Sequence, residues 1–521
     1  MSSSTSSGTT TIPSPPVISN NQEALTPNLA QQDSLRDEEN QIRQPIKKDD
    51  IQVEPIYSAF SLNQRYLIIA LASISATFSG FASNIYFPAI PIIAKALNTT
   101  EGNINLTVTS YMVFQAISPT FWGAVSDVYG RRLTILCTFV VFLSACIGLA
   151  LSNHLYQLII LRCLQSTGSA STIAIGSGMI GDIFTRAERG GYMGIFQTGL
   201  LTPLAIGPVL GGIFAETLGW RAIFWFLAIY SGIYLVILVL FLPETLRSIV
   251  GNGSIAPYHL AKATFENYVS NREETIKDGS VNTKKEIKID FIAPLKILFH
   301  KEVFFVVLYL AIHYATWQMT LTIQSSFFES IYGLTEIQIG LTFLSNGLGC
   351  MIGTLTTGKL LDKDYKKAKE KYKDLVNEEE FPIEIVRLRT IWFWSILQLF
   401  SVLLFSWTID KHLHISAPII SNFILAWSAM SIQSIISTFL VDIFAKQAAS
   451  ATASLNLARC CMGAIATGTI NPLVNKIGIG WGFMVWVGLM VLSLGLVFIQ
   501  MKFGMKWRRK REEEERLDRE R

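Results

Sequence analysis

Charged residues are scarce in this chain of 521 residues. Only 16% are Asp, Glu, Lys or Arg, and 50% are hydrophobic, whereas a soluble globular protein usually carries about 25% charged residues. The deficit is concentrated in apolar runs of about 20 residues or more, the length with which a helix crosses the hydrocarbon core of a bilayer. The composition therefore excludes an ordinary soluble protein and indicates a chain that spans a membrane repeatedly.

Other features are absent as well. No apolar segment precedes Tyr66 and the opening is rich in Ser and Thr, so we expect no cleavable signal peptide. None of the six cysteines has zinc or disulfide spacing, and all lie in apolar runs, which favours a packing role. No nucleophile, metal or nucleotide motif stands out. We therefore expect neither an enzyme nor a protein that binds a metal or nucleic acid.

The sequence contains twelve long apolar runs. A buried helix of a soluble protein could imitate one such run, but not twelve. They predict an all-α integral membrane protein with twelve transmembrane helices. The runs are 66–90, 104–125, 133–152, 155–180, 190–215, 221–243, 303–325, 337–360, 388–409, 416–440, 448–472 and 481–503.

Basic residues are distributed unevenly between the loops. If the N-terminus is cytoplasmic, the inner loops hold most of them, including Arg131, Arg132, Arg186, Arg189 and the cluster at Lys359–Lys373. The outer loops hold Lys95, Arg221, Lys411 and Lys476. This asymmetry predicts a multi-pass protein with both termini in the cytoplasm. The plasma membrane is the default location, and a vacuolar or spore-related membrane is the alternative.

The runs divide the chain into five parts. Residues 1–60 are rich in Ser, Thr, Pro, Gln and Asn, and we expect a disordered cytoplasmic tail. Six runs fill 61–243 and six fill 303–503, with a polar cytoplasmic loop at 244–302 between them. A charged cytoplasmic tail at 504–521 is expected to be a solvated helix. The end of the loop, IDFIAPLKILFH, either lies along the inner membrane surface or packs against the helix ends.

The two halves resemble each other weakly. GAVSD at Gly123–Asp127 recurs as GKLLD at Gly358–Asp362, and GDIF at Gly181–Phe184 recurs as VDIF at Val441–Phe444. Each pair occupies the same place in its half, after the second or the fourth run. This order favours a duplicated six-helix unit, as in many transporters.

The fifth run carries a stripe without large side chains. Its small and kinking residues are Gly199, Pro203, Gly207, Pro208, Gly211 and Gly212. Four of them follow one another at steps of four, so a helix places them on one face. Another helix or a substrate can approach such a face closely, and prolines that cannot donate a backbone hydrogen bond allow the helix to bend.

Several stretches carry motifs that occur together. They are NIYFPAIP at Asn84–Pro91, GAVSDVYGRR at Gly123–Arg132, LIILRCLQSTG at Leu158–Gly168 and IGPVLGG at Ile206–Gly212. Together they resemble the major facilitator superfamily, and within it the fungal twelve-span drug–proton antiporters. LPETLRSIVGNGS at Leu242–Ser254 is similar to the quinidine-resistance subgroup in particular. The resemblance implies the major facilitator fold, in which two six-helix halves rock about a shared centre.

The resemblance also implies a gate at the inner ends of the second to fourth runs. A glycine would let the second run approach a neighbour, and the arginines could pair with either aspartate. The alternative is that Gly-Arg-Arg is only a topological anchor. The candidate gating residues are Gly123, Asp127, Gly130, Arg131, Arg132 and Asp182.

Three ionisable residues lie near the middle of predicted runs, where a charge is costly and usually functional: Arg162, His313 and Arg459. Arg162 matches the arginine that the family links to proton coupling, although Ser166 stands where the family usually has glycine. His313 could carry a proton, because imidazole titrates near neutral pH, or it could simply be hydrogen-bonded. No Asp or Glu is embedded in a run, so Asp127 at the inner face is a further candidate for proton coupling.

Polar and aromatic residues could line a central cavity suited to amphipathic or cationic solutes. They are Tyr111, Gln115, Gln165, Tyr314, Trp317, Gln318, Asn346, Asn456 and Arg459. We therefore expect a monomeric, proton-coupled exporter of small amphipathic or cationic molecules. Its partners would be these substrates, protons and the lipid bilayer, with no cofactor besides the proton gradient. The alternatives are a physiological exporter of amino acids, weak acids or polyamines, and a transporter-like solute sensor.

Overall fold

The computed structural model describes residues 57–185, 188–255, 293–371, 382–444 and 448–520, which belong to one compact unit, Ile56–Arg521. Within these ranges the regular secondary structure is entirely helical. The predicted disordered tail and most of the predicted central loop lie outside the described residues.

Each of the twelve predicted runs overlaps one long helix. In the first half these are α2 (Leu62–Asn84), which continues through η1 (Phe87–Ala89) and α3 (Ile90–Ala96), then α4 (Glu101–Tyr129), α5 (Arg131–Ala150), α6 (Leu155–Ile183), α7 (Arg189–Thr217) and α8 (Arg221–Phe241). In the second half they are α12 (Lys301–Tyr332), α13 (Glu336–Lys371), α15 (Ile391–Asp410), α16 (Ser416–Ile443), α17 (Ala448–Ile477) and α18 (Ile479–Glu520). Short helices lie between them: α9 (Arg247–Val250), α11 (Ala293–Leu298) and α14 (Ile383–Leu388).

Ten helices in the described part of the chain are long and apolar enough to cross a membrane. The two long helices that fall short of this hydropathy are α4 and α17, with 29 and 30 residues. They pack against each other. Their polar residues therefore belong to an internal seam of the protein, where a membrane protein can tolerate them.

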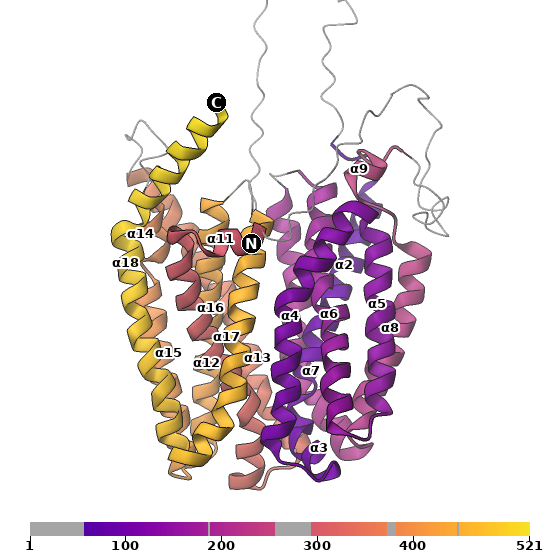
Figure 1. Cartoon of the computed structure of the whole chain (residues 1–521), viewed down its shortest axis with the longest axis vertical. Coiled ribbons are helices and arrows are strands. Elements are labelled where there is room, and N and C mark those ends of the chain that lie inside the picture. The colour runs from indigo at the N-terminus through magenta and orange to yellow at the C-terminus, as the bar shows by residue number, and fades with distance from the viewer. Residues whose placement is uncertain (1–56, 186–187, 256–292, 372–381, 445–447, 521) are drawn as a thin grey trace, which may run out of the picture. The chain divides into compact units, whose positions relative to one another are not determined.

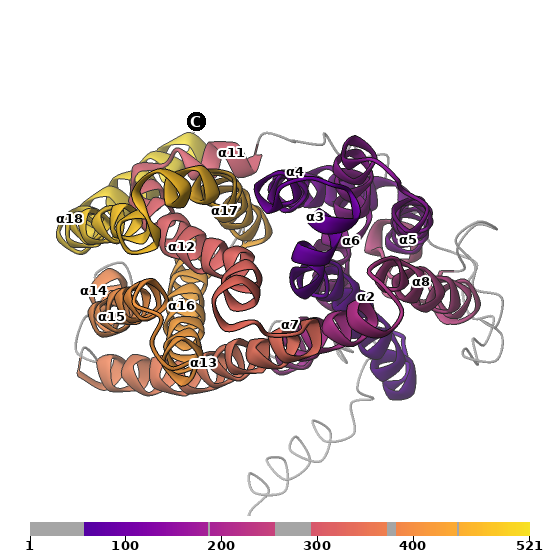
Figure 2. The same ribbon diagram turned by 90° about the horizontal axis from the view of Figure 1, so that it is seen from below.

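The helices form two groups that correspond to the two halves (Figure 1). In the first group α6 packs against α2, α4 and α5, and in the second α16 packs against α13 and α15. Two helix pairs join the groups, α7 with α13 and α4 with α17 (Figure 2). We call the end at which α2 begins and α8 ends the tail face, at the top of Figure 1, and the other end the opposite face.

Local sequence determines where several helices begin and end. Ser61 and Gln64 form a capping box at the start of α2, each side chain accepting a hydrogen bond from the backbone of the other. Gly130, with φ of 105°, separates α4 from α5 by a conformation that other residues rarely adopt. Gly333 ends α12 in the left-handed conformation, at φ of 64°.

The C-terminal tail is helical as predicted, and one face of its first turns packs on the protein. The Nε of Arg508 lies 2.9 Å from Glu384 Oε1, and both side chains are buried. The Nε of Arg511 lies 2.5 Å from Glu302 Oε1. On this face the tail is not solvated, because α14 and the start of α12 present buried carboxylates to α18, whereas Arg509 and Lys510 are exposed as expected.

The described end of the central loop packs against helices. It forms α11, which contacts α12 and α17. Ile297 is buried there in a cluster with residues of α12 and α16. These contacts favour the second of the two alternatives for IDFIAPLKILFH, that of a segment packed on the helix ends.

Candidate functional site: ion pairs at the tail face and two arginines in the bundle

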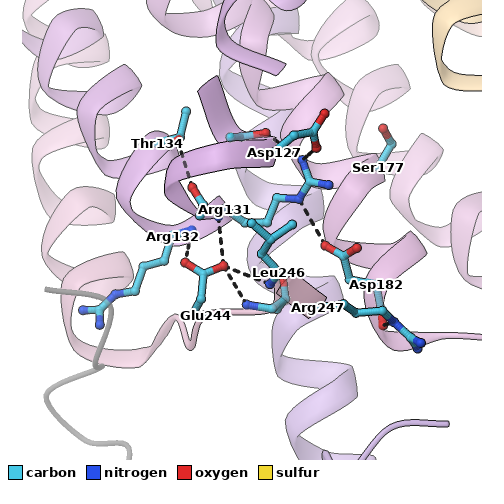
Figure 3. Close-up of polar contacts among 12 residues, drawn as sticks. Asp127, Arg131, Arg132, Thr134, Ser177, Asp182, Glu244, Leu246 and Arg247 are labelled. Carbon is cyan, nitrogen blue, oxygen red and sulfur yellow. Dashed lines mark hydrogen bonds and ion pairs between the residues drawn. The ribbon is translucent and has the colours of Figure 1, made fainter. Parts of the chain in front are cut away.

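Four of the six candidate gating residues, Asp127, Arg131, Arg132 and Asp182, lie together at the tail face (Figure 3). One guanidinium nitrogen of Arg131 lies 2.6 Å from Asp127 Oδ1, and its Nε lies 3.1 Å from Asp182 Oδ2. Asp127 lies two residues before the end of α4, and Asp182 lies one residue before the end of α6. Arg131, the first residue of α5, therefore joins the ends of three helices. Arg132 points elsewhere and donates to the carbonyl of Val239 at 2.7 Å.

Glu244 is a central member of this cluster that the sequence reasoning missed. Its carboxylate accepts hydrogen bonds from the backbone N–H groups of Arg131 and Arg132, at 2.9 and 3.1 Å, and from those of Thr245 and Leu246, both at 2.9 Å. A carboxylate at the start of α5 satisfies N–H groups that have no partner within the helix. The signal was an acidic residue directly after an apolar run, in LPET.

Gly130 is required by this arrangement. A Cβ at this position would lie 2.5 Å from Glu244 Oε2, and its φ of 105° disfavours any other residue. The close approach of the Glu244 carboxylate to the backbone, together with the positive φ, therefore explains why position 130 is a glycine.

The second half repeats the arginine–aspartate pair. The Nε of Arg387 in α14 lies 2.8 Å from Asp442 Oδ2 at the end of α16. Asp442 belongs to VDIF and Asp182 to GDIF, so the repeat detected in the sequence corresponds to equivalent ion pairs. The sequence reasoning missed Arg387, which lies between the eighth and ninth predicted runs and whose correspondence to Arg131 is not visible in the sequence.

Arg162 is sealed inside the first half. Its side chain donates to the carbonyl of Ala82 at 2.8 Å and to Gln165 Oε1 at 2.7 Å. The guanidinium carbon lies 4.5 Å from the ring centre of Tyr86 and 4.3 Å from that of Tyr111. With 1% of its surface exposed, the residue is a fixed cation held by carbonyls and aromatic faces.

Arg459 lies in the second half and is only partly buried. Its Nε and one terminal nitrogen lie 3.2 and 2.9 Å from Asn456 Oδ1, and the other terminal nitrogen lies 3.3 Å from Gln433 Oε1. The ring centre of Tyr314 is 5.0 Å away. Asn456 also donates to the carbonyl of Gln115 at 3.0 Å, which links α17 to α4 of the first half.

His313 points away from the first half. Its Nδ1 lies 2.7 Å from Gln398 Oε1 in α15, and Gln398 returns a hydrogen bond to the His313 carbonyl at 3.0 Å. The imidazole also lies 4.3 Å from the ring of Tyr309. A fully buried histidine with these partners matches the alternative of a hydrogen-bonded core residue.

Six of the nine candidate cavity residues belong to the surroundings of the two arginines. Tyr111 and Gln165 surround Arg162. Tyr314, Asn456 and the Gln115 carbonyl lie around Arg459.

The remaining three cavity candidates lie in the second half. Trp317 donates from Nε1 to Asn346 Oδ1 at 2.8 Å, which orients the indole between α12 and α13. Gln318, in the same helix, is buried.

The stripe of α7 faces its own half. A Cβ at Gly199 would overlap the carbonyl of Ser73, and one at Gly211 would overlap that of Ile85; Pro203 packs on Gly80. Gly207 also lies against Asn84, where a Cβ would make an ordinary contact at 3.5 Å. The helix that approaches the bare face is therefore α2.

The adjacent residues of α7 face the other half. The backbone of Pro208 touches Gly340 of α13, and a Cβ at Gly212 would overlap the carbonyl of Glu336. Pro208 and Gly212, which lie beside the stripe, thus make the contact of α7 with α13 of the other half.

Comparison with known proteins agrees with this architecture. The chain matches the profile of the Major Facilitator Superfamily over residues 72–467. The chain belongs to this superfamily. It is 35% identical over 473 residues to Citrate exporter 1 of Aspergillus niger, covering 88% of this chain and 90% of the relative. It is 32% identical to MFS antiporter QDR2 of Candida albicans, covering 87% and 92%.

A solved structure shares the fold. A bacterial homologue of the human lysosomal transporter Spinster, in an inward-facing and unoccupied conformation, superposes with a TM-score of 0.56 at 12% identity, covering 86% of this chain and 98% of that one. The predicted family, its fungal antiporter branch and the all-α membrane fold are confirmed. The chain is a multi-pass membrane transporter and not an enzyme.

Proposed function

We propose that this transporter exports small organic acids by alternating access of its two halves. The observation that carries the proposal is the sign of the charges inside the bundle. Arg162 and Arg459 lie near the middle of their runs, and no Asp or Glu lies within any of the twelve runs. Charge in a weakly polar interior acts strongly on a solute, so a cationic centre attracts anions and repels cations.

This proposal selects weak acids from the alternatives left open by the sequence. The similarity to a relative named Citrate exporter 1 supports it. The expected substrates are compact acids with one or more carboxylates, for which planar arginine side chains are well-suited partners.

Coupling to protons needs no protein carboxylate in this case. A weak acid binds and releases its own protons on the two sides of the membrane. A membrane potential that is negative inside also favours the exit of an anion, by about 2.3 kcal/mol per charge per 100 mV. Arginine keeps its proton, so Arg162 would act as a fixed charge and not as a carrier. His313, which faces α15, is a weaker candidate for a proton carrier than the substrate itself.

The same proposal includes an orientation. The tail face, which carries Arg131, Arg387 and the Lys-rich end of α13, would be cytoplasmic, with both termini inside. The protein would act as a monomer in the plasma membrane, and its partners would be its substrates, protons and the surrounding lipid.

A second candidate is efflux of cationic or amphipathic drugs. It is favoured by the aromatic side chains beside the central region, where Trp317 lies edge-on to Tyr314 at 5.6 Å. Aromatic faces bind organic cations. The similarity to antiporters of the QDR group supports the same class.

Efflux from proteoliposomes separates the candidates. Vesicles containing the purified full chain would be loaded with labelled citrate or with the cationic dye rhodamine 6G, and a pH difference or a potassium diffusion potential would then be imposed. We expect citrate efflux that rises when the inside is negative and is absent from protein-free vesicles. Movement of the dye without citrate would establish the second candidate instead. Movement of neither solute would contradict transport of both classes.

A further inference from the structure

We infer that Arg459 is the carboxylate-binding residue of the central site, and that Asn456 exchanges partners when an anion binds. This inference deepens the proposed function and rests on it. The ligand class is an organic anion with at least one carboxylate.

The partners of Arg459 leave its charge uncompensated. Its hydrogen bonds go to two neutral amide oxygens, Asn456 Oδ1 and Gln433 Oε1. No ion pair of Arg459 occurs with any described residue. A carboxylate offers two oxygens and a negative charge to a planar guanidinium, and such bonds are shorter and stronger than those to a neutral amide. A carboxylate can therefore replace Asn456 Oδ1 as the acceptor of the hydrogen bonds from Nε and the neighbouring terminal nitrogen of Arg459.

Arg459 is also placed where a solute can reach it. On α17 it shares a face with the buried Ala466 and Ile470. The exposed Cys461 and Ile465 lie on the other side of the helix. The exposed part of Arg459 therefore faces the interior of the protein and not the lipid. One turn further toward the opposite face, Gly463 is covered by Met112 and Tyr314. Arg459 thus lies next to the point where the contact between α4 and α17 begins.

Arg162 does not meet these conditions. It is 1% exposed, and the rings of Tyr86 and Tyr111 both lie against its guanidinium group. A substrate anion could reach it only after one of these tyrosines moves. Of the two arginines inside the bundle, Arg459 is therefore the one that a substrate anion can reach in this conformation.

Asn456 connects anion binding to the interface between the halves. Its Oδ1 accepts from Arg459 while its Nδ2 donates to the carbonyl of Gln115 in α4. When a carboxylate takes over Arg459, Asn456 Oδ1 loses both hydrogen bonds from the guanidinium group and keeps only the weak one from Cys460 Sγ at 3.6 Å. The hydrogen bond between α17 and α4 is then no longer held in place, which links occupancy to separation of the two helices.

Binding of labelled citrate to the purified full chain in nanodiscs tests this assignment. Arg459→Gln should weaken citrate binding roughly 10- to 100-fold, because it removes a charged hydrogen-bonding group. Arg459→Lys should weaken it less, because the charge remains while the planar fork is lost. Lys476→Gln removes the same charge from the exposed end of the same helix and should bind citrate like the unmodified protein.

Asn456→Asp provides an independent test that keeps Arg459 in place. A carboxylate at this position would pair with Arg459 and compete with the ligand, so we expect citrate binding to weaken about tenfold. Asp cannot donate to the Gln115 carbonyl, but the new ion pair offsets this lost hydrogen bond, so the melting temperature should change little. If Arg459→Gln does not fold, this variant tests whether Arg459 binds the carboxylate of the ligand.

The outcomes distinguish the two proposals. Unchanged citrate binding in both Arg459→Gln and Asn456→Asp, with the unmodified protein binding and exporting citrate, would overturn the role of Arg459 and leave organic-acid export standing. If the unmodified protein neither binds nor moves citrate or succinate, organic-acid export itself is overturned.

Discussion

The two ends of the interface between the halves differ. Toward the opposite face α7 and α13 touch backbone to backbone at Gly212 and Gly340, and Glu216 Oε2 accepts from the N–H of Ile337 at 2.9 Å. Toward the tail face, a Cβ added at Gly123 or Gly358 would meet no atom within 4 Å among the described residues. Among the described residues, the two halves are therefore in contact toward the opposite face and apart at these two glycines of the tail face.

The open end carries the same kind of surface as the closed end. Gly123 lies on the face of α4 that includes Gly102 and Thr109, which meet Asn471 and Gly468 of α17. Gly358 lies on the face of α13 that includes Gly340 and Gly347. One bare stripe thus runs along each helix, covered in one half of its length and uncovered in the other. Such stripes suit two halves that close alternately at either end.

The largest effect is expected from adding side chains to the uncovered part of the glycine stripes on α4 and α13. A Cβ at Gly358 or Gly123 has room in the present structure, but Gly358→Leu and Gly123→Leu would obstruct closure at the tail face. With a cost of overpacking to the closed state of about 1–3 kcal/mol, transport falls roughly 5- to 150-fold while the melting temperature is preserved. The measurement is citrate efflux from proteoliposomes together with thermal unfolding.

Gly488→Leu is the matched control, because a Cβ there also meets no atom within 4 Å, but on α18, away from the interface between the halves. It should transport normally. Equal loss in all three variants would show that the effect is not specific to the interface.

A smaller effect is expected at the closed end, where Gly212 faces the other half and Gly211 faces its own half. Gly212→Ala would press on Glu336 of the other half, and Gly211→Ala on Ile85 of its own half. The first should shift the protein toward the conformation open at the opposite face, and the second should lower the free energy of unfolding by about 1–3 kcal/mol. Reactivity of an added cysteine at Asn103 and thermal unfolding report these effects separately. Identical behaviour of the two variants would contradict the assignment of their faces.

The ion-pair cluster at the tail face is expected to contribute moderately. Glu244→Gln keeps the shape but removes the charge that caps α5, and should destabilise the protein by about 1–2 kcal/mol. Asp127→Asn should cost less stability, because the Asp127 side chain is 52% exposed. Chemical unfolding of the two variants side by side checks this order, and a larger loss for Asp127→Asn would reverse it.

The smallest effect is expected from the ion pair that joins the halves at the opposite face. Lys95 pairs with Glu329, but the Lys95 side chain is 70% exposed. Glu329→Gln should change stability by no more than about 1 kcal/mol, and the difference should disappear in high salt. A loss that persists at 1 M salt would mean that the pair is a main lock of the closed end.

Much of the fold could be predicted because a bilayer imposes a simple pattern on sequence. Each apolar run became a helix, including the more polar α4 and α17. The choice of partners could not be predicted in the same way. Periodicity puts the glycines of α7 on one face, but only the packing shows that this face meets α2.

The same limit applied to single residues. The position of His313 in its run was visible, but whether its ring faces the other half or α15 depends on the rotation of the helix. Glu244 and Arg387 act through partners far away in the sequence, so their roles emerged only from the folded chain.

The most direct test of alternating closure is a pair of distance measurements between spin labels on α4 and α17. One pair of cysteines would replace Val128 and Thr452 at the tail face, and the other would replace Asn103 and Asn475 at the opposite face, with the exposed Cys137 and Cys461 removed. Upon addition of saturating citrate, we expect a population in which the tail-face distance shortens and the opposite-face distance lengthens. If citrate is transported while both distances stay unchanged, or while both change in the same direction, the two ends do not alternate and the account is wrong.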